Sequence, residues 1–285
     1  MTNTMKRKSV KRQHFLARLY LRNFADPMHG KKLCVYEFRK QKWDCERTPE
    51  GIGYRLHNCS FIDNDGKKND ELDQFITKEI EPPAIRGIKS LADGRDLSDQ
   101  DKRPVARFIA YTQARLPGNM DAVLKQHVAE QNLADRWLDE ICARKWCEQL
   151  NLPYTPETIY DYLKPTLIKA MPVWAEAKAK DLLTWDWHKI TTDRDRPFIT
   201  SDRLLFGQKD DDSGVVSCPI SPQVTLLMTR NGDLNPNRDM AEQVRDINKR
   251  TMANAKDFVI GWKPDFPGAD LLPTICQRLE TASSE

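Results

Sequence analysis

The sequence contains no apolar run that approaches the ~18–20 residues of a membrane-spanning helix, so we expect no membrane partner. Its 12 glycines and 17 prolines follow no regular period, which excludes a fibrous protein. Hydrophobic residues make up only 39% of the chain, but seven Trp, ten Phe and seven Tyr supply large side chains for a core. We therefore expect all 285 residues to belong to a single folded domain.

Most sequence signatures of known active sites are also absent. There is no G-x-G-x-x-G, no phosphate-binding P-loop, no H-E-x-x-H and no G-x-S-x-G. Only five histidines are present, which limits acid–base chemistry near neutral pH. The sequence therefore identifies no cofactor, and Mg²⁺ enters only through the acidic residues considered below.

The cysteines do not form a recognisable framework. There are seven, an odd number, and they are widely spaced without a C-x-x-C. This pattern argues against a disulfide scaffold or a zinc ribbon, and buried reduced thiols explain it most simply. The N-terminal sequence also lacks the apolar core of a secretory signal. These features predict a cytoplasmic protein.

Positive charge is concentrated near the start of the chain. Residues 1–25 carry seven Lys or Arg and no acid, whereas the rest holds 38 basic and 42 acidic residues. A basic head on a mildly acidic body is typical of a protein that contacts nucleic acid or an acidic partner. A solubilising tail that leads into a helix explains the same charges.

Hydrophobic spacing predicts an α+β fold, in which a mainly helical N-terminal two-thirds packs with an antiparallel β-meander from the C-terminal third. We expect a basic flexible tail over 1–12, a mainly helical part over 13–182, and sheet with one helix over 183–262. Residues 275–285 are expected to fray.

The first group of residues suited to chemistry lies in a predicted helix over 13–24. His14, Arg18 and Arg22 follow one another at intervals of four, on one flank of that helix. Two guanidinium groups that hold phosphate oxygens beside an imidazole that moves a proton would suit phosphate chemistry. Alternatively, His14 makes a core contact and both arginines pair with acids.

The second group stands at the end of a predicted strand, Phe198–Asp202. Asp202 would bind Mg²⁺ or orient a base, and Ser201 would bind an oxyanion, because a rigid strand presents both at an exposed loop. The alternative is a local Ser or Asp turn that closes the strand.

Two further candidates are helical. Arg115 ends a predicted helix, where it supplies an anion contact or compensates the helix dipole. Asp73, Glu79 and Glu81 precede Pro82, and with Asp202 they offer carboxylates for a divalent cation. We take Glu81 and Asp202 as the metal candidates; the alternative for Glu81 is a solvated helix face.

The segment Gln13–Phe24, a Gln-His pair followed by an aromatic-rich stretch ending in Leu-Arg-Asn-Phe, resembles the opening motif of the family called domain of unknown function 4238. The likeness continues, in order, through Val35–Tyr36, Leu72–Glu81, Phe108–Pro117, Pro197–Asp202, Pro219–Pro222 and Asn248. Asp73 departs from the pattern, which has Glu there. The resemblance implies a microbial, mostly bacterial family without an agreed activity, and it singles out His14, Arg22, Arg115 and Asp202 for testing.

Two functions from different classes follow. The first is an enzyme that cleaves or modifies a phosphodiester, with host defence as one setting: His14 is the acid or base, Arg18, Arg22 and Arg115 hold phosphate, and Asp202 binds metal or orients a group. The second is a non-catalytic module that binds nucleic acid or protein and whose polar motif residues are structural. The enzyme hypothesis expects His14 and Asp202 to face one cleft.

Overall fold

The computed structural model describes residues 12–63, 67–117, 119, 133–149, 151, 153–207, 214–230 and 239–282. Most of the predicted basic tail and residues 283–285 of the predicted frayed tail lie outside these ranges. The sequence also predicts a long helix over about 119–149, and residues 120–132 of it lie outside the described ranges.

Helices make up the larger part of the described chain. They are α1 (Arg18–Leu21), α2 (Glu71–Phe75), a π-helix (Ile76–Ile80), α3 (Glu81–Ala92), α4 (Asp99–Ala114), α6 (Leu133–Gln149), α7 (Pro156–Leu183), α8 (Met240–Asn254) and α9 (Leu272–Ala282). Short 3₁₀ turns cover Arg22–Phe24, Phe38–Lys40, Pro49–Gly51 and Ala269–Leu271.

The strands are distributed along the whole chain. They are β1 (Arg12–His14), β2 (Leu33–Glu37), β3 (Lys42–Arg47), β4 (Tyr54–Leu56), β5 (Phe61–Ile62), β6 (Lys68–Asn69), β7 (Asp186–Thr191), β8 (Thr200–Ser201), β9 (Phe206–Gly207), β10 (Val215–Ser221), β11 (Val224–Thr229) and β12 (Phe258–Gly261). Every described strand pairing is antiparallel.

Two four-stranded sheets organise the molecule. One has the order β7-β11-β10-β9, and the other has the order β3-β2-β12-β8. The α+β class is confirmed, but the expectation that the sheet comes from the C-terminal third is wrong. The second sheet joins N-terminal β2 and β3 to C-terminal β12 and β8, because β12 pairs with β2 along its length.

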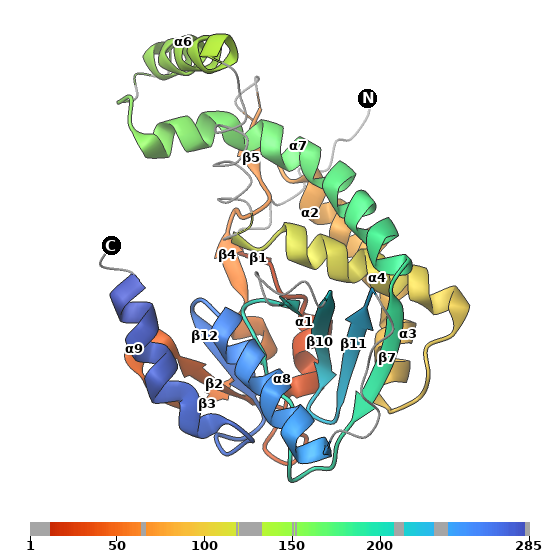
Figure 1. Cartoon of the computed structure of the whole chain (residues 1–285). Coiled ribbons are helices and arrows are strands. Elements are labelled where there is room, and N and C mark those ends of the chain that lie inside the picture. The colour runs from red at the N-terminus through yellow and green to blue at the C-terminus, as the bar shows by residue number, and fades with distance from the viewer. Residues whose placement is uncertain are drawn as a thin grey trace.

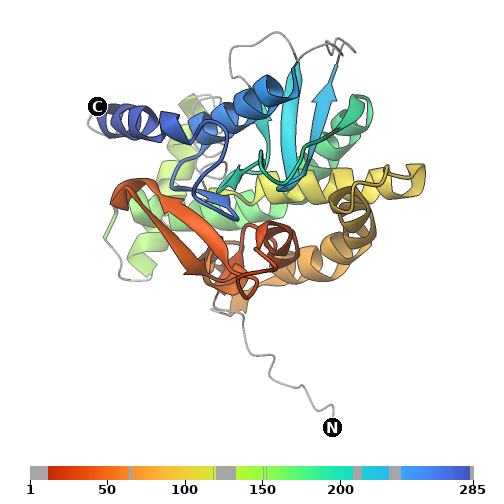
Figure 2. The ribbon, with the colours of Figure 1, turned by 90° about the horizontal axis from the view of Figure 1, so that it is seen from below.

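Helices surround the two four-stranded sheets (Figure 1). Helices α3, α4 and α7 pack beside the β7–β11–β10 sheet, α8 contacts both β8 and β9 and so touches both sheets, and α9 lies near β2 and β3. Seen from below, the N-terminal and C-terminal thirds of the chain lie side by side (Figure 2). One large apolar core joins α1, α3, α4, α7 and both sheets, with Leu16, Leu21 and Leu33 fully buried.

The predicted helix over 13–24 is only half present. Gln13 and His14 lie in β1, opposite Arg55 and Tyr54 of β4, and helical structure begins at Arg18. The Gln13 side chain favours the strand, because its amide donates to Ser60 Oγ at 2.6 Å and accepts the Cys59 N–H at 2.7 Å. His14, Arg18 and Arg22 therefore do not share one helix face.

A close backbone approach fixes the bend after β1. The N–H groups of Phe15 and Leu16 both donate to the carbonyl of Gly53, at 2.8 and 3.1 Å. Gly53 has φ +68°, and a Cβ there would lie 3.0 Å from the Leu16 Cβ. Glycine is therefore required at position 53, and this turn brings β4 beside β1.

Two cysteines depart from the expectation of reduced thiols. Cys34 of β2 and Cys45 of β3 form a disulfide, so that expectation is wrong for this pair. The other five, Cys59, Cys142, Cys147, Cys218 and Cys276, are free. Within the described residues, no helix has both the length and the apolar character needed to cross a membrane.

Candidate functional site

His14 sits at the junction of β1, β4 and the 3₁₀ turn Pro49–Gly51. Its ring lies 5.6 Å from the Tyr54 ring between centroids, and a ring nitrogen hydrogen-bonds to the backbone of Glu50. The other nitrogen, Nε2, is buried and has no hydrogen-bond partner within the described part of the chain. Buried polar atoms of this kind are uncommon and require an explanation.

The surroundings of His14 favour its neutral form. Burial lowers the pKa of the imidazole, and the positive charges of Arg18 and Arg115 lower it further. The hydrogen bond to Glu50 and the charge of Glu81 act in the opposite direction but do not prevail. A neutral ring that donates one N–H to Glu50 retains a lone pair on Nε2, so it is able to accept a proton.

Arg115 lies inside the protein, just after α4. Its side chain is 2% exposed; Nε donates to the Phe15 carbonyl at 3.1 Å, and a terminal nitrogen contacts Glu81 Oε1 at 2.8 Å. The Arg115 carbonyl accepts the side-chain amide of Asn58 at 2.8 Å. The guanidinium therefore joins α3 to the segment after β1, next to His14.

Two carboxylates complete this polar interior. Glu81 opens α3 directly after the π-helix, and Asp73 is buried in α2. Burial raises the pKa of Asp73, Arg115 lowers it, and the negative charge of Glu81 raises it again. Perturbed groups gathered beside a π-helix are typical of functional sites. We call His14, Asp73, Glu81 and Arg115 the His14 cluster.

The exposed side of the His14 cluster carries further arginines. Arg12 lies over the Tyr54 ring, 4.9 Å from its centroid, and Arg18 is exposed close enough to His14 to lower its pKa. Arg22 forms an exposed ion pair with Glu50 at 3.0 Å. Positive charge therefore borders His14 on the solvent side. The charge of Arg22 is compensated by Glu50.

Asp202 is buried where β8 ends. Its Oδ1 accepts the Lys256 N–H and its Oδ2 accepts the Asp257 N–H, both at 2.9 Å. Ser201 Oγ accepts the Arg203 N–H at 3.0 Å, which is the local turn considered from the sequence. The carboxylate thus ties the start of β12 to the end of β8.

A pocket joins the two regions that the sequence singled out. Its lining includes Phe15, Leu116 and Pro117 together with Asp202 and Arg203. Its volume of about 20 Å³ is close to the space for one water molecule. The neighbours of His14 and Arg115 therefore meet Asp202, whereas the His14 side chain does not line this pocket.

The predicted metal site is not assembled. Among the residues that the structure describes, no three His, Cys, Asp or Glu side chains come together so as to hold a metal ion. Glu81 instead contacts Arg115, and both oxygens of Asp202 accept backbone N–H groups.

The sequence alone did not point to several members of this region. Glu50, Tyr54 and Ser60 contact β1, but the sequence over residues 43–66, which contains them, predicts irregular structure. Gly53 is a local signal for a turn in the sequence. Its role in placing β4 beside β1 is seen only from the pairing of these two strands in the structure.

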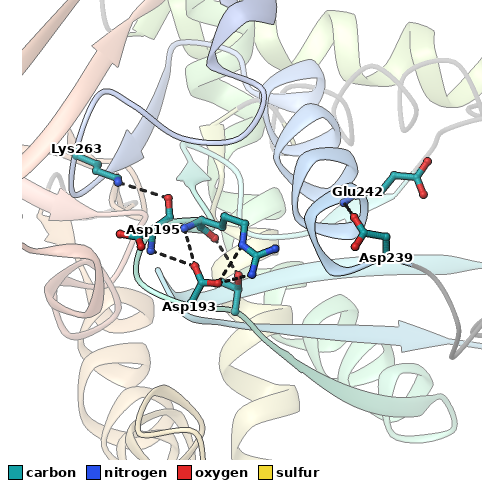
Figure 3. Close-up of polar contacts among 7 residues, drawn as sticks. Asp193, Asp195, Asp239, Glu242 and Lys263 are labelled. Atoms are coloured by element: carbon teal, nitrogen blue, oxygen red, sulfur yellow. Dashed lines mark hydrogen bonds and ion pairs between the residues drawn. The ribbon is translucent and has the colours of Figure 1, made fainter.

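Another group of acids lies in the loop between β7 and β8 (Figure 3). Asp193 accepts the N–H groups of Asp195 and Arg196, and it also pairs with the Arg196 guanidinium. Asp239 caps α8 by accepting the Glu242 N–H at 3.1 Å. Asp193 thus closes a loop and Asp239 begins a helix.

The burial of Asp202 predicts a pH effect on stability. Burial raises the pKa of this carboxyl to about 6, against the lowering effect of its two N–H bonds. The folded state then binds more protons than the unfolded chain, so stability falls as pH rises from about 4 to 6. Relative to Asp202→Asn, the wild type should lose about 2 kcal/mol over this range, measured by urea unfolding.

Asp193→Asn provides the matched control. The hydrogen bond to Arg196 lowers the pKa of exposed Asp193, so its contribution is lost as pH falls, with the opposite sign. Parallel pH profiles for the wild type and Asp202→Asn would show that Asp202 has an ordinary pKa.

Comparison with known proteins identifies the family. The model of a family described as protein of unknown function (DUF4238) matches residues 12–265, so the chain belongs to that family and the resemblance seen in the sequence is confirmed. Neither the curated proteins nor the solved structures contain a match.

Proposed function

We propose that this DUF4238 protein processes phosphodiester bonds, with His14 as the general base. The observation that carries the proposal is the buried Nε2 of a neutral imidazole, which no described group satisfies. A base that is unprotonated at neutral pH and fixed by a backbone hydrogen bond is suited to remove a proton from a nucleophile. Arg18, exposed beside it, supplies positive charge for a phosphate.

The proposed step requires few groups. Nε2 takes the proton of a water or hydroxyl group while that oxygen forms a bond to phosphorus. The P–O bond to the leaving oxygen breaks, and solvent returns a proton to that oxygen. Arg12 and Arg18 stabilise the charge on the phosphate oxygens. Because Nε2 is covered in the free protein, a substrate must displace the atoms over it.

Arg115, Glu81 and Asp202 take positioning roles in this proposal. Arg115 holds the Phe15 carbonyl, one residue after His14, and Glu81 holds Arg115. Asp202 holds the Lys256–Asp257 segment at the pocket that Phe15 also lines. The side-chain oxygens of Glu81 and Asp202 are thus engaged by groups of the fold itself.

The test of the proposal is turnover of nucleic acid by the purified chain. Labelled single-stranded and double-stranded RNA and DNA are incubated with it, each with and without Mg²⁺. We expect new labelled products from at least one substrate, formed at a rate proportional to the concentration of the protein. Intact label in every reaction contradicts the proposal.

One observation favours a second function, which is binding without catalysis. Gln13, Ser201 and Asp202 each satisfy groups inside the fold, as structural residues do. Exposed Arg12 stacks on Tyr54, and arginine–aromatic surfaces bind single-stranded nucleic acid. Salt-dependent binding of intact RNA or DNA, with no product, is the result that selects this function.

A further inference from the structure

Three cations from separate parts of the chain line the pocket beside Asp202. Arg55 comes from β4, Arg203 follows β8, and Lys256 follows α8. Arg55 and Lys256 are exposed, and Arg203 is half-buried. Tertiary structure, and not a run of basic sequence, therefore concentrates this charge.

These cations differ from several other arginines of the protein. Arg22, Arg107, Arg115 and Arg196 each form an ion pair with an acid. Within the described ranges, Arg55, Arg203 and Lys256 have no acidic side-chain oxygen at ion-pair distance. Their charge is thus available to an anion from outside.

The acids of the pocket do not cancel this charge. Asp202 uses both oxygens to accept backbone N–H groups, and Asp257 is the other acid in the lining. With both carboxylates ionised, the three cations still leave an excess of one positive charge. Burial also raises the pKa of Asp202 to about 6, which reduces its negative charge below that pH.

The size of the pocket sets what enters it. A volume of about 20 Å³ admits one atom of the size of a water oxygen, and a phosphate oxygen has that size. Phe15, Leu116 and Pro117 form an apolar wall that limits screening by water. A small anionic group seated by one oxygen fits both the space and the charge.

We infer that this pocket binds a phosphate group of a nucleic acid, with one oxygen in the cavity and Arg55, Arg203 and Lys256 around the others. That the pocket binds a phosphate group is inferred from the pocket alone. That the phosphate belongs to a nucleic acid rests on the proposed function. Phe15, which lines the pocket, directly follows His14 at the end of β1. The phosphate in the pocket would therefore be a neighbour, along one nucleic-acid strand, of the phosphate held at His14.

Calorimetry with inorganic phosphate tests the pocket directly. We expect saturable binding to the wild type, and a Kd about tenfold higher for Arg203→Ala, because each charge-assisted contact contributes about that much. Arg103→Ala is the control, since Arg103 is also exposed but lies near the opposite end of α4 from Leu116. No saturable binding, or equal Kd values for wild type and Arg203→Ala, overturns the inference.

A second set of measurements separates the pocket from the reaction. Lys256→Ala repeats the test should Arg203→Ala fold poorly by circular dichroism. His14→Ala should bind inorganic phosphate as the wild type does, even where turnover is lost, so the two proposals fail independently. Binding of a short single-stranded RNA should weaken about tenfold in Arg203→Ala. Unchanged RNA affinity with weakened phosphate affinity overturns the assignment to nucleic acid.

Discussion

Replacing His14 by alanine is expected to lower phosphodiester turnover about 10²–10⁴-fold, which is the usual contribution of a positioned general base. The reason is the loss of an imidazole that combines a lowered pKa with a buried Nε2 for which the described residues offer no hydrogen-bond partner, beside an exposed arginine. The measurement is kcat/KM for His14→Ala and wild type on the substrate found in the incubations, at neutral pH.

His29→Ala is the matched control for that comparison. His29 is 80% exposed and pairs with Asp26 on the surface, away from the described contacts of His14. We expect its kcat/KM to equal that of the wild type. Equal activity of His14→Ala and His29→Ala, with both folded by circular dichroism, would remove His14 from the reaction.

Replacing Arg115 by alanine is expected to lower the free energy of unfolding by about 3–5 kcal/mol, the usual cost of removing one partner of a buried ion pair. The change leaves Glu81, which is only 16% exposed, without its cation, and it leaves the Phe15 carbonyl without its guanidinium donor. Urea unfolding at pH 7 measures the loss.

Arg107→Ala isolates the effect of burial. Arg107 lies on the same helix α4 and pairs with Glu176 at 2.6 Å, but these side chains are 29% and 34% exposed. We expect it to cost about 1 kcal/mol or less. Should Arg115→Ala not fold, Arg115→Lys is measured in its place. Lysine keeps the positive charge but lacks the planar guanidinium that reaches both Phe15 and Glu81. Similar losses for Arg107→Ala and Arg115→Ala would contradict a special role for the buried pair.

Local pattern was sufficient for some of the fold and not for the rest. Phe258–Gly261 and Val224–Thr229 form strands as their apolar and β-branched residues predict, because such side chains favour a strand locally. The strand at Gln13–His14 was predicted as helix, because the apolar spacing of Phe15, Leu16, Leu19 and Tyr20 is helical. Pairing with β4 and the contacts of Gln13 with Ser60 and Cys59 favour the strand, and Ser60 and Cys59 are 47 and 46 positions away.

The site shows the same division. Residue type and spacing singled out His14, Arg115 and Asp202, all of which have buried polar groups in the structure. The contact between Arg115 and Glu81 was not predicted, since α3 and the end of α4 meet only in the folded chain. The pairing of Asp202 with backbone N–H groups was not predicted either, because no side chain at positions 256 and 257 signals it.

Whether His14 is a base held ready in its neutral form is decided by the pKa of its imidazole. In an NMR titration of the imidazole, identified by the signal that His14→Ala lacks, we expect a pKa below the ordinary 6.5. We also expect that Arg18→Ala moves that pKa upward, because a nearby positive charge is removed. A pKa at or above 6.5 in the wild type would mean that the ring is not held neutral, and it would contradict the account of His14 as a prepared base.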